Sequence, residues 1–136
     1  MPEAFHEVVE YSILASPANP FDPMEKAMKA LGARALAGTE HLHRDWTLVR
    51  EYPLSEDLLA MSHVWRSPDE RDFVVAAKGS PEAIASLCHF DEPRTEWLHG
   101  RVRRMASTGL RAIGVARARP KAPGLPTGQH AFASEL

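Results

Sequence analysis

One lysine and one arginine occupy conspicuous places in the sequence. Lys78 follows five apolar residues of a predicted strand and precedes Gly79. A lysine at a half-buried strand end costs free energy unless a carboxylate or a ligand anion meets it, and the adjacent glycine lets a ligand approach the backbone. Arg111 opens another apolar segment, so the same argument applies there. The residues alone leave two interpretations of Lys78 open: an anion site, or a lysine that extends into solvent.

The histidines and the cysteine give weaker signals. His41 and His43 would share one face of a strand, and His89 adjoins Cys88, but no CxxC or HExxH pattern adds a third ligand. We therefore predict no metal site. We interpret Cys88, the single cysteine, as a small buried residue of a short helix rather than a nucleophile. The sequence also contains no glycine-rich phosphate loop.

Length and composition are typical of one globular domain. The 136 residues are 44% hydrophobic and 25% charged, which argues against disorder and coiled coil. A chain of this size buries a sufficient core without disulfides or metals. No apolar run reaches the roughly 20 residues of a membrane helix, and the acidic N-terminus is unlike a secretory signal. We expect a soluble domain.

Charge is distributed unevenly along the chain. Residues 1–96 carry a balance of −8 and residues 97–136 a balance of +6. The two parts either attract each other within one domain or build an anion site, and charge alone leaves both open. A nucleic-acid interface is a third hypothesis, based on Arg101, Arg103, Arg104, Arg117, Arg119 and Lys121. The pI of about 6.4 and the lack of an RNA-binding or recognition-helix motif argue against it, so we predict no nucleic-acid partner.

Two amphipathic helices are predicted at the start of the chain. The first spans residues 3–16, and the second runs from a cap at Asp22 to Gly38. Glu25 stands where a capping box requires a carboxylate. The predicted apolar faces are Phe5, Val8, Val9 and Ile13 in the first helix, and Met24, Ala27, Met28, Leu31 and Ala35 in the second.

Strands and further helices follow. Strands are predicted over 46–52, 61–65, 73–77 and 110–116, with an antiparallel hairpin across the turn at 67–70 and a break at Lys78–Gly79. Ser80 caps a short helix, and a longer one covers 92–107 with Leu98, Val102 and Met105 as its apolar stripe. This order predicts an α+β fold, an antiparallel sheet with helices packed on it in two layers.

Several of these segments, in order, resemble the nucleotide-binding domain of P-type cation-transporting ATPases. The matching segments are DPMEKAM at 22–28, MSHV at 61–64, KGSPE at 78–82 with the helix to Cys88, and GLRAIGVA at 109–116. They are similar to the family's DPxExAl segment, its MS-V strand, its KGxPE signature and its GLRvlavA strand. The resemblance covers roughly residues 3–117 and is greatest to bacterial pumps related to calcium and magnesium transporters.

The resemblance implies roles for individual residues. Lys78 would line the depth of an adenine pocket, and Gly79 would let the ring approach. Glu25 would accept a hydrogen bond from the adenine amino group, a role compatible with capping. Arg111 would meet the ribose or the phosphates. The domain would cover residues 1–119, and the Pro/Gly-rich residues 120–136 would lead back to the phosphorylation domain.

Two positions depart from the family pattern. Leu54 stands where relatives carry a phenylalanine that stacks on adenine, and Leu59 stands in place of a second lysine. Base–aromatic stacking contributes about 1–3 kcal/mol, so Leu54 predicts a loss of roughly tenfold or more in affinity. Tyr52 or Trp65 is a speculative substitute for the aromatic surface. A degenerate domain that acts through domain–domain contacts, with weak or no nucleotide binding, is therefore the alternative.

The implied function is that of a cytoplasmic ATP-binding domain in an integral membrane pump. It would position ATP for phosphoryl transfer to an aspartate on a separate domain. The DKTGT-type motif, the Mg²⁺ site and the membrane helices of such pumps are not in these 136 residues, so we predict no catalytic residue in the chain and no efficient hydrolysis by it alone. Expected partners are ATP or ADP and the phosphorylation and actuator domains of the same pump, with the isolated chain monomeric.

Overall fold

The computed structural model describes residues 5–16, 22–36, 46–67 and 73–120. The elements are α1 (His6–Leu14), α2 (Pro23–Ala35), β1 (Thr47–Tyr52), β2 (Ala60–Arg66), β3 (Phe73–Gly79), α3 (Pro81–Leu87), α4 (Glu92–Ser107) and β4 (Gly114–Ala118). Several predictions lie outside the described residues: the helix end at Gly38, the histidines His41 and His43, the turn at 68–70 and the linker over 121–136. None of the helices in the described ranges is long and apolar enough to cross a membrane.

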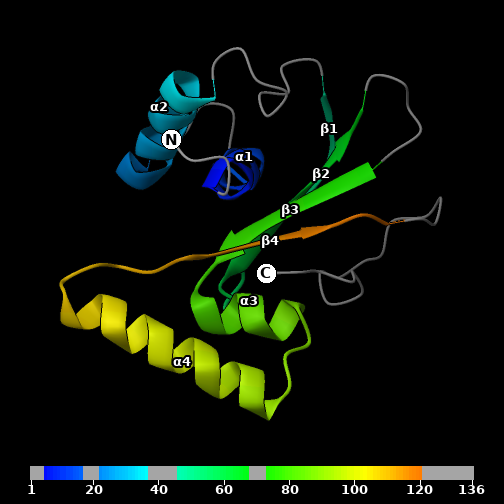
Figure 1. The fold of residues 1–136 in the computed structure, drawn as a ribbon. Coiled ribbons are helices and arrows are strands. Elements are labelled where there is room, and N and C mark those ends of the chain that lie inside the picture. The colour runs from blue at the N-terminus through cyan, green and yellow to red at the C-terminus, as the bar shows by residue number, and fades with distance from the viewer. Residues whose placement is uncertain (1–4, 17–21, 37–45, 68–72, 121–136) are drawn as a thin grey trace.

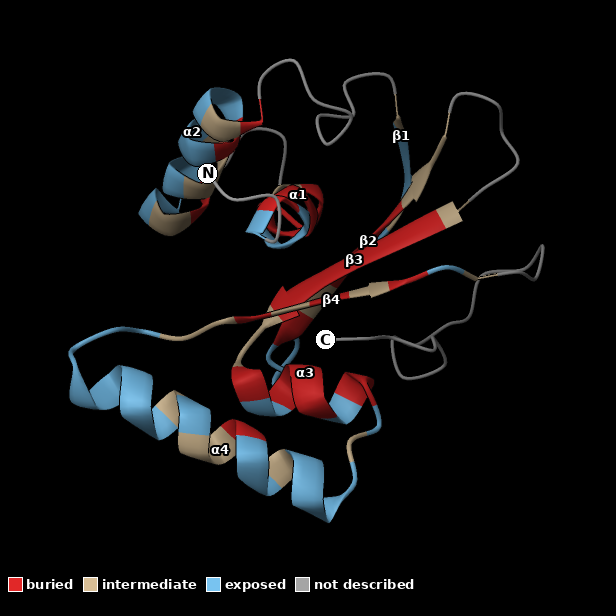
Figure 2. Ribbon diagram, viewed as in Figure 1, coloured by how far each residue is buried: buried red, intermediate tan, exposed pale blue. Residues whose placement is uncertain are grey.

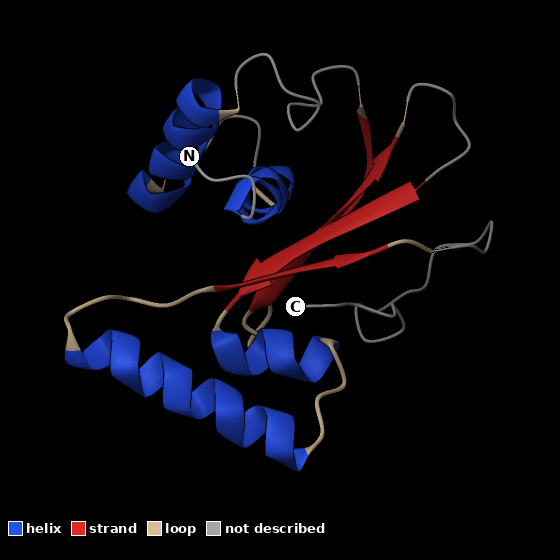
Figure 3. Cartoon of the chain, viewed as in Figure 1, coloured by secondary structure: helices blue, strands red, loops and turns tan. Residues whose placement is uncertain are grey.

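Within the described residues the sheet has four strands in the order β1-β2-β3-β4, and every neighbouring pair is antiparallel. Helices α1 and α2 lie on one side of it and α3 and α4 on the other (Figures 1 and 3). The predicted α+β class and the β2–β3 hairpin are confirmed, but helices cover both faces of the sheet, which makes three layers rather than the predicted two (Figure 1).

Strand periodicity explains why the sheet is covered on both sides. Val74 and Ala76 of β3 pack against Tyr11 and Leu14 of α1, which forms one core cluster. The alternate residue Ala77 points to the opposite face. It packs with Ala60, Ala116, Ile84 and Leu87 in a second cluster that includes α3. Figure 2 shows β3 buried almost along its full length, as expected for a strand between two layers of helix.

Three of the described helices begin with a side-chain cap; the caps at Asp22 and Ser80 were predicted, whereas the cap at Asp91 was not. Asp22 Oδ1 accepts a hydrogen bond from the Met24 amide at 2.8 Å, and Asp91 Oδ1 accepts one from the Arg94 amide at 3.1 Å. The Ser80 hydroxyl accepts one from the Ala83 amide at 3.2 Å. A proline follows each cap in the first or second helical position, where no amide donor is needed.

Two strand boundaries differ from the prediction. β3 does not break at Lys78, because Lys78 pairs with both Met61 and Val115, and Gly79 is also paired on both sides. β4 begins at Gly114 rather than residue 110, so placing Arg111 at the start of a strand is wrong. β3 ends at Gly79, opposite Gly114, and therefore residues 110–113 have no β3 residue to pair with.

The predicted apolar faces of the first two helices are wrong in part. In α1, Phe5 and Val8 are exposed while Glu10 is buried. In α2, Leu31 is exposed while Glu25 and Gly32 are buried. Gly32 is buried because the two helices approach closely there: a Cβ at this position would lie 2.1 Å from Ile13 Cδ1. Glu25 is buried in its ion pair with Lys78. In α4, Leu98 is buried as predicted, but Met105 is 47% exposed.

Candidate functional site

A cavity of about 320 Å³ lies at the end of the sheet where β2 begins and β3 ends, beside the N-terminus of α2. We call it the Lys78 cavity. All five residues predicted to form a site line it: Glu25, Leu54, Lys78, Gly79 and Arg111. They come from α2, the β1–β2 connection, β3 and the α4–β4 connection, so only the tertiary fold brings them together.

A buried ion pair forms one wall of this cavity. Lys78 Nζ lies 2.7 Å from Glu25 Oε1, and the two side chains are only 7% and 11% exposed. Ala77 packs on the side of the sheet that carries α3. Because neighbouring residues of a strand point to opposite faces, Lys78 points to the side that carries α1 and α2. The interpretation in which Lys78 extends into solvent is wrong. The anion that meets it within the chain is Glu25.

The Glu25 carboxylate pairs with Lys78 rather than with the helix amides. Asp22 caps the Met24 amide as predicted, whereas the Glu25 carboxylate is directed at Lys78. Glu25 lies in the first turn of α2, where the exposed amides of the helix favour a negative charge. In a buried ion pair each charge compensates the desolvation of the other. Loss of either side chain therefore leaves the remaining charge desolvated and unpaired.

Gly79 permits a close approach of backbone to backbone. A Cβ at this position would lie 2.3 Å from the Leu59 carbonyl oxygen and 2.7 Å from Ala60 Cα. The Ser80 amide donates a hydrogen bond of 3.0 Å to the same Leu59 carbonyl. Glycine is therefore required by the packing of β2 against β3 at the cavity edge, whatever the cavity binds.

The mouth of the cavity is aliphatic and carries two exposed side chains of opposite charge, Asp22 and Arg111. Leu54 and Leu59 are 53% and 59% exposed. Arg111 is exposed in the segment between α4 and β4, and no carboxylate of the described residues pairs with its guanidinium. No aromatic side chain is among the described residues that line this cavity.

The two aromatic residues suggested as substitutes lie elsewhere. Tyr52 is buried in a cluster with Val64, Val75 and Ala118. Trp65 donates its indole N–H to the Leu14 carbonyl at 2.8 Å. Neither lines the Lys78 cavity, so the suggestion that one of them offers an aromatic surface there is wrong.

The sequence analysis missed a buried histidine near the cavity. His63 of β2 is 5% exposed, its Nδ1 lies 3.1 Å from the Leu14 carbonyl oxygen, and its Nε2 lies 3.8 Å from Glu51 Oε1. Burial lowers the pKa of His63, and the Glu51 carboxylate opposes that shift. The alternation of His63 with Met61 and Trp65 in a strand was a signal for a shared face, but it could not show that α1 covers that face.

Other chemistry-bearing residues do not gather. No group of three His, Cys, Asp or Glu side chains within the described ranges is arranged to hold a metal ion. Cys88 is buried in the core cluster that includes Ile84 and Leu87, so its prediction as a small core residue is confirmed.

Comparisons with known proteins add a partial similarity. No protein-family model matches the chain. It is 29% identical over 101 residues to the sodium/potassium exporting P-type ATPase cta3 of Schizosaccharomyces pombe, which covers 70% of this chain and 10% of that protein. It is 34% identical over 77 residues to the cation-transporting ATPase catp-5 of Caenorhabditis elegans, covering 54% of this chain and 6% of that protein.

These matches support a P-type ATPase fragment. The chain spans a tenth or less of the length of these two relatives. Both relatives are eukaryotic, so the predicted likeness to bacterial pumps stays a prediction. The α+β fold is consistent with a nucleotide-binding domain of such ATPases.

Proposed function

We propose that this chain is the ATP-binding domain of a P-type cation-transporting ATPase and that adenine enters the Lys78 cavity. The observation that carries the proposal is the convergence of Glu25, Leu54, Lys78, Gly79 and Arg111 on one cavity. The family resemblance of the sequence implies the same five positions as the nucleotide site. The partial similarity to P-type ATPases supports the same function.

The buried pair has the hydrogen-bonding capacity to recognise adenine. A carboxylate has two acceptor oxygens and an ammonium group has three donors, so Glu25 and Lys78 can remain paired and still bind a base. Adenine presents an amino donor beside a ring-nitrogen acceptor, which matches a carboxylate beside an ammonium group. Guanine presents a carbonyl oxygen in place of that amino group, so we propose a preference for adenine.

The phosphates would extend from the cavity toward Arg111. Its guanidinium is exposed and has no carboxylate partner in the described part of the chain, which suits contact with an anionic group. Mg²⁺ would arrive with the phosphates and neutralise part of their charge. In the complete pump, an aspartate of another domain would attack the γ-phosphorus, which forms an acyl phosphate and releases ADP. The contribution of this chain is to position the nucleotide at the cytoplasmic side of the membrane.

The aliphatic mouth favours a second candidate function. Leu54 and Leu59 offer neither a stacking ring nor a charge, and both are more than half exposed. A domain with this mouth would bind nucleotide weakly or not at all and would act through contacts with the other domains of the pump. The two candidates differ in whether the cavity of the unmodified chain binds ATP.

An ATP titration followed by ¹H–¹⁵N NMR tests both candidates. We expect shifts at the amides of Lys78, Glu25 and Arg111 at millimolar ATP. Leu54→Phe should tighten binding about tenfold because it restores base stacking. Leu110→Phe is the matched control, since Leu110 is 62% exposed and does not line the cavity.

The outcomes separate the candidates. Shifts in the unmodified chain that Leu54→Phe strengthens and Leu110→Phe leaves unchanged support ATP binding. Shifts that appear only after both Leu54→Phe and Leu59→Lys are introduced support the degenerate domain. If neither the unmodified chain nor the doubly substituted chain responds to ATP, the nucleotide proposal is wrong.

A further inference from the structure

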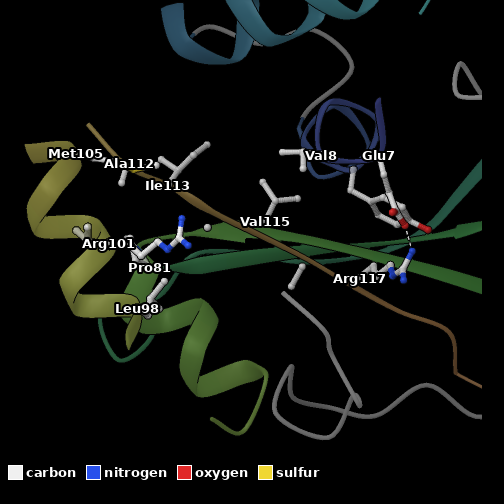
Figure 4. Close-up of a pocket in the computed structure, with 14 residues that line it drawn as sticks. Glu7, Val8, Pro81, Leu98, Arg101, Met105, Ala112, Ile113, Val115 and Arg117 are labelled. Atoms are coloured by element: carbon white, nitrogen blue, oxygen red, sulfur yellow. Dashed lines mark ion pairs between the residues drawn. The ribbon is translucent and has the colours of Figure 1, made fainter. Parts of the chain in front are cut away.

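A second cavity of about 290 Å³ follows the outer edge of β4 (Figure 4). We call it the β4 groove. Its walls are α1 on one side and α4 on the other, and β4 is the last strand of the sheet on this side. It is separate from the Lys78 cavity, although Pro81, Ala112 and Ile113 line both.

The walls of the groove are mainly apolar. Val8 comes from α1, and Leu98 and Met105 come from α4. Ile113 directly precedes β4, and Val115 lies in it. Val8 and Met105 are 54% and 47% exposed, so apolar surface remains open to solvent here. Desolvation of this surface would favour an apolar ligand.

The charges in the groove are not balanced. Glu7 and Arg117 form an ion pair across its α1 side, which neutralises both (Figure 4). Arg101 extends from α4 toward β4, and its guanidinium carbon lies 5.0 Å from the centroid of the Trp97 ring. No carboxylate of the described residues pairs with Arg101. Among the described residues that line the groove, Arg101 is therefore the cation without a carboxylate partner, and the Trp97 contact holds it in place.

We propose that the β4 groove binds a small amphipathic anion, with its apolar body between α1 and α4 and its anionic group on Arg101. The volume suits a ligand of modest size, because small-molecule sites begin at about 300 Å³. An arginine accepts a carboxylate, sulfonate or phosphate through paired N–H donors. The shared chemistry is an apolar ring or chain that ends in one anionic group.

Fluorescence of 8-anilinonaphthalene-1-sulfonate is a direct test, because this probe combines an aromatic body with a sulfonate. We expect saturable binding by the full chain in the absence of nucleotide, so the result does not depend on the proposed ATP site. Arg101→Gln should weaken binding about tenfold, which is the usual effect of losing one charge-assisted hydrogen bond. Val8→Glu should weaken it as well by placing a like charge in the groove.

Two matched variants locate the probe. Arg103→Gln removes an exposed arginine of the same helix that does not line the groove, and Leu54→Glu places a charge at the mouth of the Lys78 cavity instead. Both should leave the affinity within about twofold of the unmodified chain. Equal losses for Arg101→Gln and Arg103→Gln, or a loss confined to Leu54→Glu, would overturn the proposal.

Competition then defines the ligand. Decanoate and 1-naphthoate should displace the probe, and the stronger of the two shows whether the apolar body is a chain or a ring. Decylamine should not compete, because its ammonium group would face Arg101. Displacement by decylamine as effective as that by decanoate would show purely apolar binding and would refute the role of Arg101. Absence of saturable probe binding would refute the site itself.

Discussion

The Glu25–Lys78 and Glu7–Arg117 ion pairs each join an N-terminal helix to the sheet, and they differ in how far they are buried. Glu25 of α2 meets Lys78 of β3, and the side chains are 11% and 7% exposed. Glu7 of α1 meets Arg117 of β4, and these side chains are 49% and 41% exposed. Water can replace a lost partner in the second pair but not in the first. The stability of the fold should therefore depend strongly on the Glu25–Lys78 pair and only slightly on the Glu7–Arg117 pair.

The largest effect is expected from breaking the buried pair. Glu25→Ala should lower the free energy of unfolding by about 3–5 kcal/mol, because it leaves the Lys78 ammonium desolvated without a carboxylate. Urea unfolding monitored by circular dichroism measures this change.

A double variant provides the control. Glu25→Leu combined with Lys78→Met removes both charges and should recover most of the lost stability, since apolar residues replace buried pairs at little cost. If Glu25→Ala costs less than about 1 kcal/mol, the pair behaves like a surface pair and the contrast between the two regions fails.

A smaller effect on the free energy of unfolding is expected from pH, through the buried histidine His63. His63 faces the Leu14 carbonyl of α1 and Glu51 of β1, with Lys78 and Glu25 close enough to act on its charge. Burial lowers the pKa of His63 below the ordinary 6.5. Just below pH 6.5 the unfolded chain is therefore protonated at His63 while the native chain is not. The free energy of unfolding should therefore fall as the pH drops through about 6.5.

His63→Gln isolates this contribution from those of the other histidines. The variant has no titrating group at this position, so its stability should decline less steeply between pH 7.5 and pH 5.5 than that of the unmodified chain. Urea midpoints at several pH values supply the comparison. Identical slopes for both proteins would mean that His63 takes up its proton equally well in the folded state.

The smallest effect is expected at the exposed pair. Glu7→Gln should lower the free energy of unfolding by at most about 1 kcal/mol, because solvent screens both side chains. The difference should shrink further at 1 M salt. A loss comparable to that of Glu25→Ala would show that burial does not decide the worth of these pairs.

The local elements could be predicted because their signals are local. Asp22 and Ser80 cap helices through neighbouring amides, and the proline directly after each cap is compatible only with the first helical turn. The strands around Val64 and Val75 follow from runs of β-branched and aromatic residues. Helix faces were less predictable, as Val8 and Glu10 show, because α1 packs against both α2 and the sheet.

The composition of the Lys78 cavity was predicted, but its internal contacts were not. The residues themselves singled out Lys78 and Gly79 at a strand end and Arg111 at the start of an apolar segment. The family resemblance added Glu25 and Leu54. Only the tertiary structure decided that Glu25 meets Lys78, that Leu59 contacts the backbone at Gly79 and that His63 lies beneath α1. Residue types report intrinsic preferences, whereas partners distant along the chain depend on how helices pack across the sheet.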